Sequence, residues 1–475
     1  MLRTYATFRD IQYDLQHGTI SCKDLVSHHL HNIHEKKHLN AFLSVYEEEA
    51  FQRAQEIDQK IKQGKAGKLA GLIVALKDVL SYNQHPLQAG SKILDGFIAQ
   101  YNGSAVQRLL DEDAIIIGRN NCDEFGMGSS NENSAFGPVL NNIDNTRVPG
   151  GSSGGSAVAV QAGLCRIALG SDTGGSVRQP AAFCGIVGLK PTYSRVSRFG
   201  LAAYASSFDC IGIFGTCVED VAQVLEVIAG EDEFDSTVSR KPVPRYTNDS
   251  AILEKYKVVY IRETLESEGL QPEIKKSMIT TIEKLKEDGH TVEAIDFPLL
   301  EYFLPTYYIL ATAEASSNLS RYDGVRYGYR SKQTHDLSSL YKKTRAEGFG
   351  KEVQRRILLG TFVLSASYYD AYYTKAQKVR KIIRNKTKDI FTQYDFIIMP
   401  TTPTTAFKLG EHLDNPIEMY LADIFSVHAN VAGIPGISVP CGKDDQGLPI
   451  GIQIMADDFE ESKLFDFSER LMKMN

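Results

Sequence analysis

Two glycine- and serine-rich segments carry the residues with the clearest potential for chemistry. They read GGSSGGS at residues 150–156 and GSDTGGS at residues 170–176. The intervening residues 157–169 have the apolar pattern of a helix followed by a strand, unlike a flexible linker. Glycine lets successive backbone N–H groups converge, and such donors stabilise the negative charge that develops on a reacting carbonyl oxygen. The two segments therefore predict an acyl-transfer enzyme that uses serine hydroxyls.

Phosphate-binding uses of glycine-rich segments fit this sequence poorly. A Walker A loop needs Lys and then Ser or Thr after its second glycine, but Gly175 is followed by Ser176 and Val177. Ser152 stands where the G-x-G of a dinucleotide-binding loop needs glycine. Nucleotide binding in these segments is therefore disfavoured.

Histidine-based catalysis and zinc binding are also disfavoured. Residues 151–155 match the G-x-S-x-G turn of α/β-hydrolases, but a polar segment precedes them where that turn follows a buried strand. The late histidines His412 and His428 are expected in ordinary surface or core positions. Residues 34–38 read HEKKH and match a zinc pattern, but they lie in a stretch dense in His and Lys that is typical of a solvated face.

One lysine and two serines remain as candidate catalytic residues. Lys77 follows the apolar run of residues 71–76, which predicts a buried strand that ends at this lysine. Ser152 and Ser176 lie in the two glycine-rich segments. Taken singly, each residue suits an ordinary strand end or turn. Together they supply a nucleophile, a proton carrier and a base in a site that needs no histidine.

The composition is that of a globular protein with a large core. The 475 residues are 43% apolar and 23% charged, and the net charge of −7 disfavours a direct nucleic-acid groove. The seven cysteines are scattered without a C-x-x-C pair, which predicts a reduced protein of the cytoplasm. The N-terminus does not resemble a signal peptide and no run of about 18 apolar residues occurs, so neither secretion nor a membrane partner is expected.

Alternating strand-like and helical patterns predict one α/β domain over residues 1–475. We expect a mixed, mostly parallel sheet with helices on both faces. Within this domain we expect an N-terminal helical cap at residues 1–65, a core at 66–230 and a helical lobe at 301–392. The expected strands are residues 71–76, 114–117, 166–169, 258–261, 396–399, 436–439 and 451–454.

A long segment of the sequence resembles the amidase signature. The similarity is carried by GGSSGGS at 150–156, GSDTGGSVRQP at 170–180 and GLKP at 188–191. Further segments, among them DEFGMGSS at 123–130 and EGFGKE at 347–352, resemble one branch of that family, the glutaminase subunits of bacterial tRNA-dependent amidotransferases. The similarity covers nearly the whole chain.

The family's catalytic residues match the three candidates. Its Lys-Asp lysine matches Lys77, its bridging serine matches Ser152, and its acyl-forming serine matches Ser176. Val79 stands where the family motif usually has asparagine, and His428 replaces a common proline. These two departures concern the shape of the pocket rather than the triad.

The resemblance implies hydrolysis of glutamine. Ser176 would attack the side-chain amide carbon, Ser152 would relay the proton, and Lys77 would be the base. An amine that is neutral at pH 7 needs its pKa lowered by roughly three units, which burial of Lys77 would provide. The backbone N–H groups expected to bind the oxyanion are those of Thr173, Gly174, Gly175 and Ser176.

The resemblance also implies how glutamine is selected. A guanidinium can grip the α-carboxylate with two hydrogen bonds, and an acidic side chain can pair with the α-ammonium group. The residues that match the family in these roles are Arg356 for the carboxylate and Asp423 for the ammonium group, with Tyr307 beside them.

Partners follow from the same resemblance. Ammonia would pass to a tRNA-binding subunit, which uses ATP and magnesium to convert Glu-tRNA(Gln) to Gln-tRNA(Gln), and a small third subunit would hold the two together in a heterotrimer. This chain is expected to bind no metal or cofactor and to meet tRNA only through its partner. Two alternatives stay open: a stand-alone amidase that hydrolyses another small amide, and a catalytically silent scaffold protein.

Overall fold

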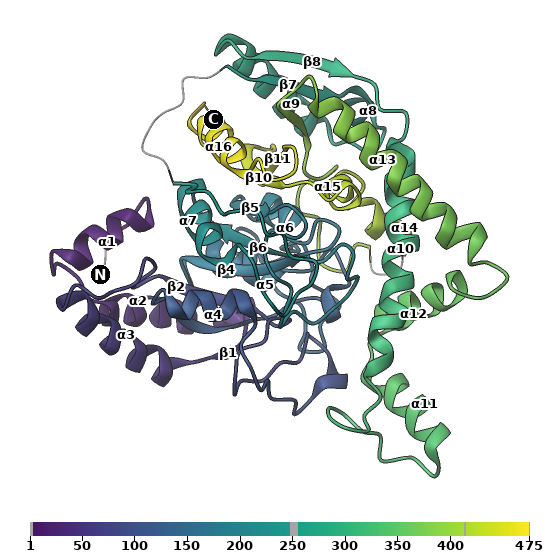
Figure 1. Cartoon of the computed structure of the whole chain (residues 1–475), viewed down its shortest axis with the longest axis horizontal. Coiled ribbons are helices and arrows are strands. Elements are labelled where there is room, and N and C mark those ends of the chain that lie inside the picture. Colours follow the sequence, from purple (N-terminus) through teal and green to yellow (C-terminus); the bar gives the residue numbers. More distant parts are fainter. Residues whose placement is uncertain (1–2, 248–254, 413–414, 475) are drawn as a thin grey trace.

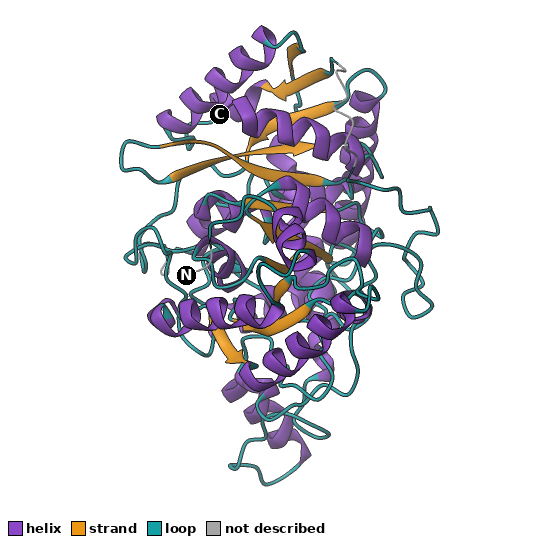
Figure 2. Ribbon diagram, turned by 90° about the vertical axis from the view of Figure 1, so that its left-hand side faces the viewer, coloured by secondary structure: helices purple, strands orange, loops and turns teal. Residues whose placement is uncertain are grey.

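A single mixed sheet forms the centre of the molecule. The structure is a computed structural model that describes residues 3–247, 255–412 and 415–474. Figure 2 shows the strands as a twisted band with helices on both sides, which confirms the α/β fold expected from the sequence. In their order across the sheet, the eleven strands of the described residues are β1 (Phe42–Val45), β3 (Ile115–Asn120), β2 (Ile73–Lys77), β4 (Ile167–Asp172), β6 (Cys210–Gly215), β5 (Val187–Lys190), β10 (Gly436–Lys443), β11 (Pro449–Met455), β9 (Phe396–Pro400), β7 (Lys257–Ile261) and β8 (Thr291–Ile295).

Parallel pairing occurs in two separate parts of this sheet. β2 pairs in parallel with β3 and β4, and β7 pairs in parallel with β8 and β9. The strands between these two groups pair antiparallel, from β4 through β6, β5, β10 and β11 to β9. β2, β3 and β4 are buried along their whole length, which is typical of parallel strands covered on both faces.

Helices cover both faces of the sheet. Gly212 in β6 lies against Val177, which precedes α6, whereas Gly215 in the same strand lies against Val221 of α7. Since residues three apart in a strand point to opposite faces, the two helices pack on opposite sides. The α-helices within the described residues are α1 (Phe8–Gln16), α2 (Cys22–Glu35), α3 (Glu47–Lys62), α4 (Ser104–Asp111), α5 (Gly154–Gln161), α6 (Arg178–Cys184), α7 (Val218–Ile228), α8 (Arg262–Glu266), α9 (Pro272–Glu287), α10 (Phe303–Asn318), α11 (Leu337–Gly348), α12 (Lys351–Val363), α13 (Lys375–Phe391), α14 (Pro416–Leu421), α15 (Val427–Ala432) and α16 (Glu461–Met474).

The N-terminal region is less purely helical than the sequence pattern predicts. α1, α2 and α3 occupy most of residues 8–63, but β1 lies between α2 and α3. β1 pairs antiparallel with β3 and forms one edge of the sheet. β1 reads Phe-Leu-Ser-Val, and all four residues are half-buried. Neither its sequence nor its burial shows the alternation that is typical of a strand.

The segment 301–392 is helical, as expected, and lies beside the sheet in Figure 1. Its central contact joins α10 and α12. Gly360 of α12 lies directly against the carbonyl oxygen of Thr312 in α10, where any Cβ would overlap that oxygen. This close approach fixes α12, the helix that carries Arg356. None of the helices within the described ranges has both the length and the apolar composition that a bilayer crossing requires.

Candidate active site

Lys77 lies where two parallel strands end at the same edge of the sheet. β2 ends at Lys77, and its parallel neighbour β4 ends at Asp172. The Lys77 side chain is fully buried, and its Nζ lies 2.7 Å from Ser152 Oγ and 2.9 Å from Ser171 Oγ. The lysine and the first serine predicted from the sequence are therefore in hydrogen-bonding contact.

Ser171 is a partner of Lys77 that the sequence argument misses. Neighbouring residues of a strand point to opposite faces, so the side chains of Ser171 and Asp172 at the end of β4 lie on different faces of the sheet. A neutral lysine amine has one lone pair and two N–H groups. It can accept the hydrogen of Ser152 while it donates one of its own to Ser171. Ser171 thereby directs the lone pair of Lys77 toward Ser152.

Burial shifts the acidity of this lysine. It lowers the pKa of Lys77 from 10.5 to about 8, and the nearby carboxylates of Asp123 and Asp172 limit that shift by favouring the charged form. The lowering corresponds to about 3 kcal/mol. At pH 7 about one-tenth of the molecules then hold a neutral amine at this position.

Ser152 and Ser176 each lie just before a helix. α5 begins at Gly154 and α6 begins at Arg178. The backbone N–H of Ser153 donates to the carbonyl oxygen of Ser176 at 3.3 Å, which joins the two glycine-rich segments. Ser152 is fully buried, whereas Ser176 is 9% exposed. Of the two hydroxyl-bearing residues, Ser176 is therefore the one that a substrate can approach.

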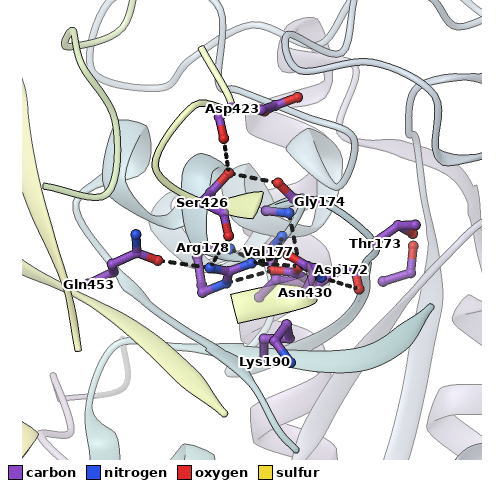
Figure 3. Close-up of polar contacts among 12 residues, drawn as sticks. Asp172, Thr173, Gly174, Val177, Arg178, Lys190, Asp423, Ser426, Asn430 and Gln453 are labelled. Atoms are coloured by element: carbon purple, nitrogen blue, oxygen red, sulfur yellow. Dashed lines mark hydrogen bonds and ion pairs between the residues drawn. The ribbon is translucent and has the colours of Figure 1, made fainter. Parts of the chain in front are cut away.

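Asp172 shapes the loop that carries Ser176. Its carboxylate accepts the backbone N–H of Gly175 at 2.9 Å and that of Val177 at 3.2 Å (Figure 3). The guanidinium of Arg178 lies 3.0 Å from the same carboxylate. Burial alone would raise the pKa of Asp172, but the charge and hydrogen bonds of Arg178, together with Lys190 and Asn430, outweigh it and lower the pKa to about 2. An ionised carboxylate therefore holds the loop on both sides of Ser176.

All five N–H groups of Arg178 are used. Nε and one N–H of Nη2 donate to Asp172, and the other N–H of Nη2 donates to Asn430 Oδ1 at 2.6 Å. Nη1 donates to the carbonyl oxygen of Ser426 at 2.7 Å and to Gln453 Oε1 at 2.8 Å. Figure 3 shows these partners around the guanidinium. Since Ser426, Asn430 and Gln453 come from α15, its N-terminal cap and β11, the C-terminal part of the chain supports the loop.

One of the four expected oxyanion donors is already occupied. The sequence predicts an oxyanion site formed by four backbone N–H groups, but that of Gly175 donates to Asp172. The prediction is wrong for Gly175, because the carboxylate that shapes the loop takes its hydrogen. The N–H groups of Thr173, Gly174 and Ser176 are left as candidates. Gly175 has a φ of 126° and faces Ser426 Oγ so closely that no side chain fits.

The two charges expected to select glutamine lie around one tyrosine. Asp423 Oδ2 accepts the hydroxyl of Tyr308 at 3.1 Å and that of Ser129 at 2.8 Å. The guanidinium carbon of Arg356 lies 5.3 Å from the centre of the Tyr308 ring. Burial raises the pKa of Asp423 to about 7. Neither Ser129 nor Tyr308 is predicted from the sequence, although Ser129 belongs to the segment 123–130 that carries the family resemblance.

Arg356 is held by groups on three elements. Its Nη1 donates to the hydroxyl of Tyr204 and its Nε donates to Glu352 Oε1, each at 2.8 Å, and the ring of Tyr420 also lies beside it. Tyr307 is buried, and a Cβ at Gly174 would collide with its hydroxyl. The ring centre of Tyr307 also lies 5.0 Å from that of Tyr308, so Tyr307 lies between the Arg356 side of the site and the loop of Ser176.

The histidines set aside in the sequence have ordinary environments. His428 is buried, its Nε2 lies 2.8 Å from Thr387 Oγ1, and its ring stacks on Phe303. His412 pairs with a surface glutamate, and so does His34 of the HEKKH segment. Within the part of the chain that the structure describes, no three His, Cys, Asp or Glu residues come together as a metal site.

The buried pair of Asp172 and Arg178 yields a stability prediction. Asp172→Asn removes the charge that balances the buried guanidinium, so we expect the free energy of unfolding to fall by about 3–5 kcal/mol in urea titrations. The matched control is Asp296→Asn, which breaks an exposed pair with Arg262 and should cost no more than about 1 kcal/mol. Equal losses of unfolding free energy in the two variants would contradict the role of Asp172 in holding the loop of Ser176.

Comparison with known proteins places this site in a family. The Amidase family model matches residues 24–465. Two relatives are the A subunits of glutamyl-tRNA(Gln) amidotransferases. The one from Chlorobaculum parvum is 49% identical over 99% of this chain and 98% of its own, and the one from Koribacter versatilis is 53% identical over 90% of each chain.

Solved structures agree with this placement. The crystal structure of the corresponding amidotransferase protein from Thermotoga maritima is 37% identical and covers 96% of this chain and 92% of its own, with a TM-score of 0.79. The peptide amidase of Stenotrophomonas maltophilia is 27% identical and covers 98% of this chain and 96% of its own, with a TM-score of 0.80. The chain therefore belongs to the amidase family, whose signature its two glycine-rich segments carry.

Proposed function

We propose that this chain is the glutaminase subunit of a tRNA-dependent amidotransferase. The observation that supports it most is the 2.7 Å contact of a buried, readily neutralised Lys77 amine with Ser152, beside the loop of Ser176. The relatives named after glutamyl-tRNA(Gln) amidotransferase match it over nearly its full length. The chain would supply ammonia for converting Glu-tRNA(Gln) to Gln-tRNA(Gln).

The reaction begins with two proton transfers. The Ser176 hydroxyl attacks the Cδ carbon of glutamine as its proton passes to Ser152 Oγ, and the proton of Ser152 passes to the Lys77 amine. A tetrahedral intermediate forms, with its oxyanion on the free N–H groups of the loop, where each donor is worth about 10²–10³ in rate. Lys77 then gives its proton back to Ser152, and Ser152 passes a proton to the leaving nitrogen, so that the C–N bond breaks, ammonia leaves and a glutamyl ester remains on Ser176. Water attacks this ester by the same route and releases glutamate.

Selectivity for glutamine rests on its zwitterionic end. Arg356 would bind the α-carboxylate, and Asp423, once ionised, would bind the α-ammonium group, with Tyr307 between them and the nucleophile loop. A stand-alone amidase for apolar amides would have no use for two buried opposite charges around Tyr308. This arrangement favours glutamine over the alternative of another small amide.

The remaining steps belong to other chains. A tRNA-binding subunit would use ATP and magnesium to activate the glutamyl end of the tRNA, and a small third subunit would complete the complex. This chain would hydrolyse glutamine, and the ammonia released would pass to the tRNA-binding subunit.

Replacing the nucleophile tests this function. We expect Ser176→Ala to lower kcat for glutamine hydrolysis by more than about 10⁴-fold, because the substitution removes the oxygen that forms the ester. Ser338→Ala, on an exposed face of α11, is the control and should keep full activity. In the assembled complex, the Ser176→Ala variant should still amidate Glu-tRNA(Gln) when ammonia is supplied. An unchanged kcat would refute the mechanism, and a wild-type chain without glutaminase activity would favour the scaffold.

The acidity of Lys77 predicts the pH profile. The base is active when neutral, so kcat should rise about tenfold per pH unit below pH 8 and level off above it. Asp423 also ionises near pH 7, but in the enzyme–glutamine complex it is already paired, so its effect should appear in KM rather than in kcat. A kcat that is flat from pH 6 to pH 9 would show that the amine is not the base.

A further inference from the structure

The helix that carries Arg356 has an outer face that the described residues leave open to solvent. Val353, Arg356 and Val363 of α12 are buried, whereas the side chains on its other side are open to solvent: Leu358 is 71% exposed. Leu359 and Phe362 lie on the same open side and are each about 40% exposed. α12 therefore offers one face to the glutamine site and a separate apolar face to the outside.

The connection to α13 extends this apolar face. In Figure 1 it lies at the outer rim of the molecule, between α12 and α13. Its aromatic rings touch one another at the surface, with ring centres 4.3 Å apart for Phe362 and Tyr368 and 6.0 Å apart for Tyr368 and Tyr372. Such clustered, exposed aromatic groups are typical of binding surfaces. The aromatic patch consists of Leu358, Leu359, Phe362, Tyr368, Tyr369 and Tyr372.

A line of cations continues from the aromatic patch along α13. Exposed side chains follow Tyr372 every three or four residues and are mainly lysines. The inner cations of α13 differ from them, because Arg384 and Lys388 are paired with Asp458 and Asp457. The outer lysines, here named the basic stripe, are Lys375, Lys378 and Lys386, with Ile382 among them at 49% exposure.

We propose that the aromatic patch and the basic stripe are the docking surface for an acidic companion subunit. The partner would place apolar side chains on the aromatic patch and carboxylates along the basic stripe. This inference rests on the proposed function, which requires companion subunits, and it names where one of them binds.

Charge disfavours two other occupants of this surface. In a two-fold dimer of this chain, both copies would bring the same three lysines into the interface, and the exposed Asp370 of each copy would leave an excess of positive charge there. An anionic membrane would attract the basic stripe but repel the exposed Asp370, which lies within the aromatic patch between Tyr369 and Tyr372. A folded protein partner can place carboxylates opposite the basic stripe and a cation opposite Asp370.

The test measures binding of the purified pair of companion subunits, the tRNA-binding one and the small one, by calorimetry. Phe362→Ser combined with Tyr368→Ser should weaken binding by more than about 30-fold. Lys375→Glu combined with Lys378→Glu, which alters charge without touching packing, should weaken it about tenfold at 50 mM salt and less at 300 mM. The matched controls, Tyr13→Ser on α1 and Lys275→Glu with Lys276→Glu on α9, are also at exposed positions and should bind within about twofold of wild type.

Each contrary result has a distinct meaning. Wild-type affinity in both docking variants, with unchanged thermal unfolding, would overturn the docking surface while leaving the proposed function intact. If wild type binds neither companion and amidates no tRNA with them, the proposed function fails and the docking surface with it. Sedimentation that shows a wild-type dimer lost in Phe362→Ser/Tyr368→Ser would assign the surface to a second copy. Co-sedimentation with anionic vesicles, lost in the lysine variants, would assign it to a membrane.

Discussion

The burial of the Lys77 amine is the constraint on which the rest of the site depends. A lysine in water is protonated at pH 7 and cannot accept a proton from a serine. Removing the amine from water costs about 3 kcal/mol. The fold tolerates this cost because β2 places the Lys77 side chain in the middle of a fully buried group of strands. Two hydroxyls then orient the amine, Ser152 as its proton donor and Ser171 as its acceptor. The site thus obtains a base from a residue that is ordinarily an acid.

A second buried charge gives the site its shape. Asp172 follows Ser171 in β4, but it serves the other side of the strand, where it binds the loop of Ser176 and the guanidinium of Arg178. Because every donor of Arg178 is used, the loop is tied to α15 and β11, which come from the far end of the chain. The nucleophile is therefore held by residues some 250 positions away in sequence, and the chemistry depends on the completed fold.

Much of the site follows from the sequence, since its signals are local. Lys77 at the end of an apolar run and the two glycine-rich segments point to the reacting groups without knowledge of the fold. Ser171 could have been noticed as a hydroxyl at the end of a buried strand. The sequence could not have shown that the Gly175 N–H is unavailable to an oxyanion, because this depends on how the Asp172 carboxylate turns back onto the loop.

The strands that the sequence pattern misses lack its signals. β5 and β6 contain glycine, β8 is half-exposed, and β1 shows no alternation. The surroundings of Arg356 and Asp423 could not be predicted from the sequence either, because α10, α12 and the loops before α15 meet only in the folded chain. The same holds for the aromatic patch, since only the structure separates exposed aromatic residues from those of the core.

Direct titration of Lys77 tests whether burial makes its amine a base. In protein labelled with ¹³C-lysine, the side-chain resonance that disappears in Lys77→Met belongs to this residue, and its chemical shift can be followed from pH 6 to pH 11. We expect a midpoint near pH 8, below the value of about 10.4 for a lysine side chain in water. A midpoint at or above about 10.4 would contradict the role of Lys77 as the base, because the amine would then be charged whenever the enzyme works.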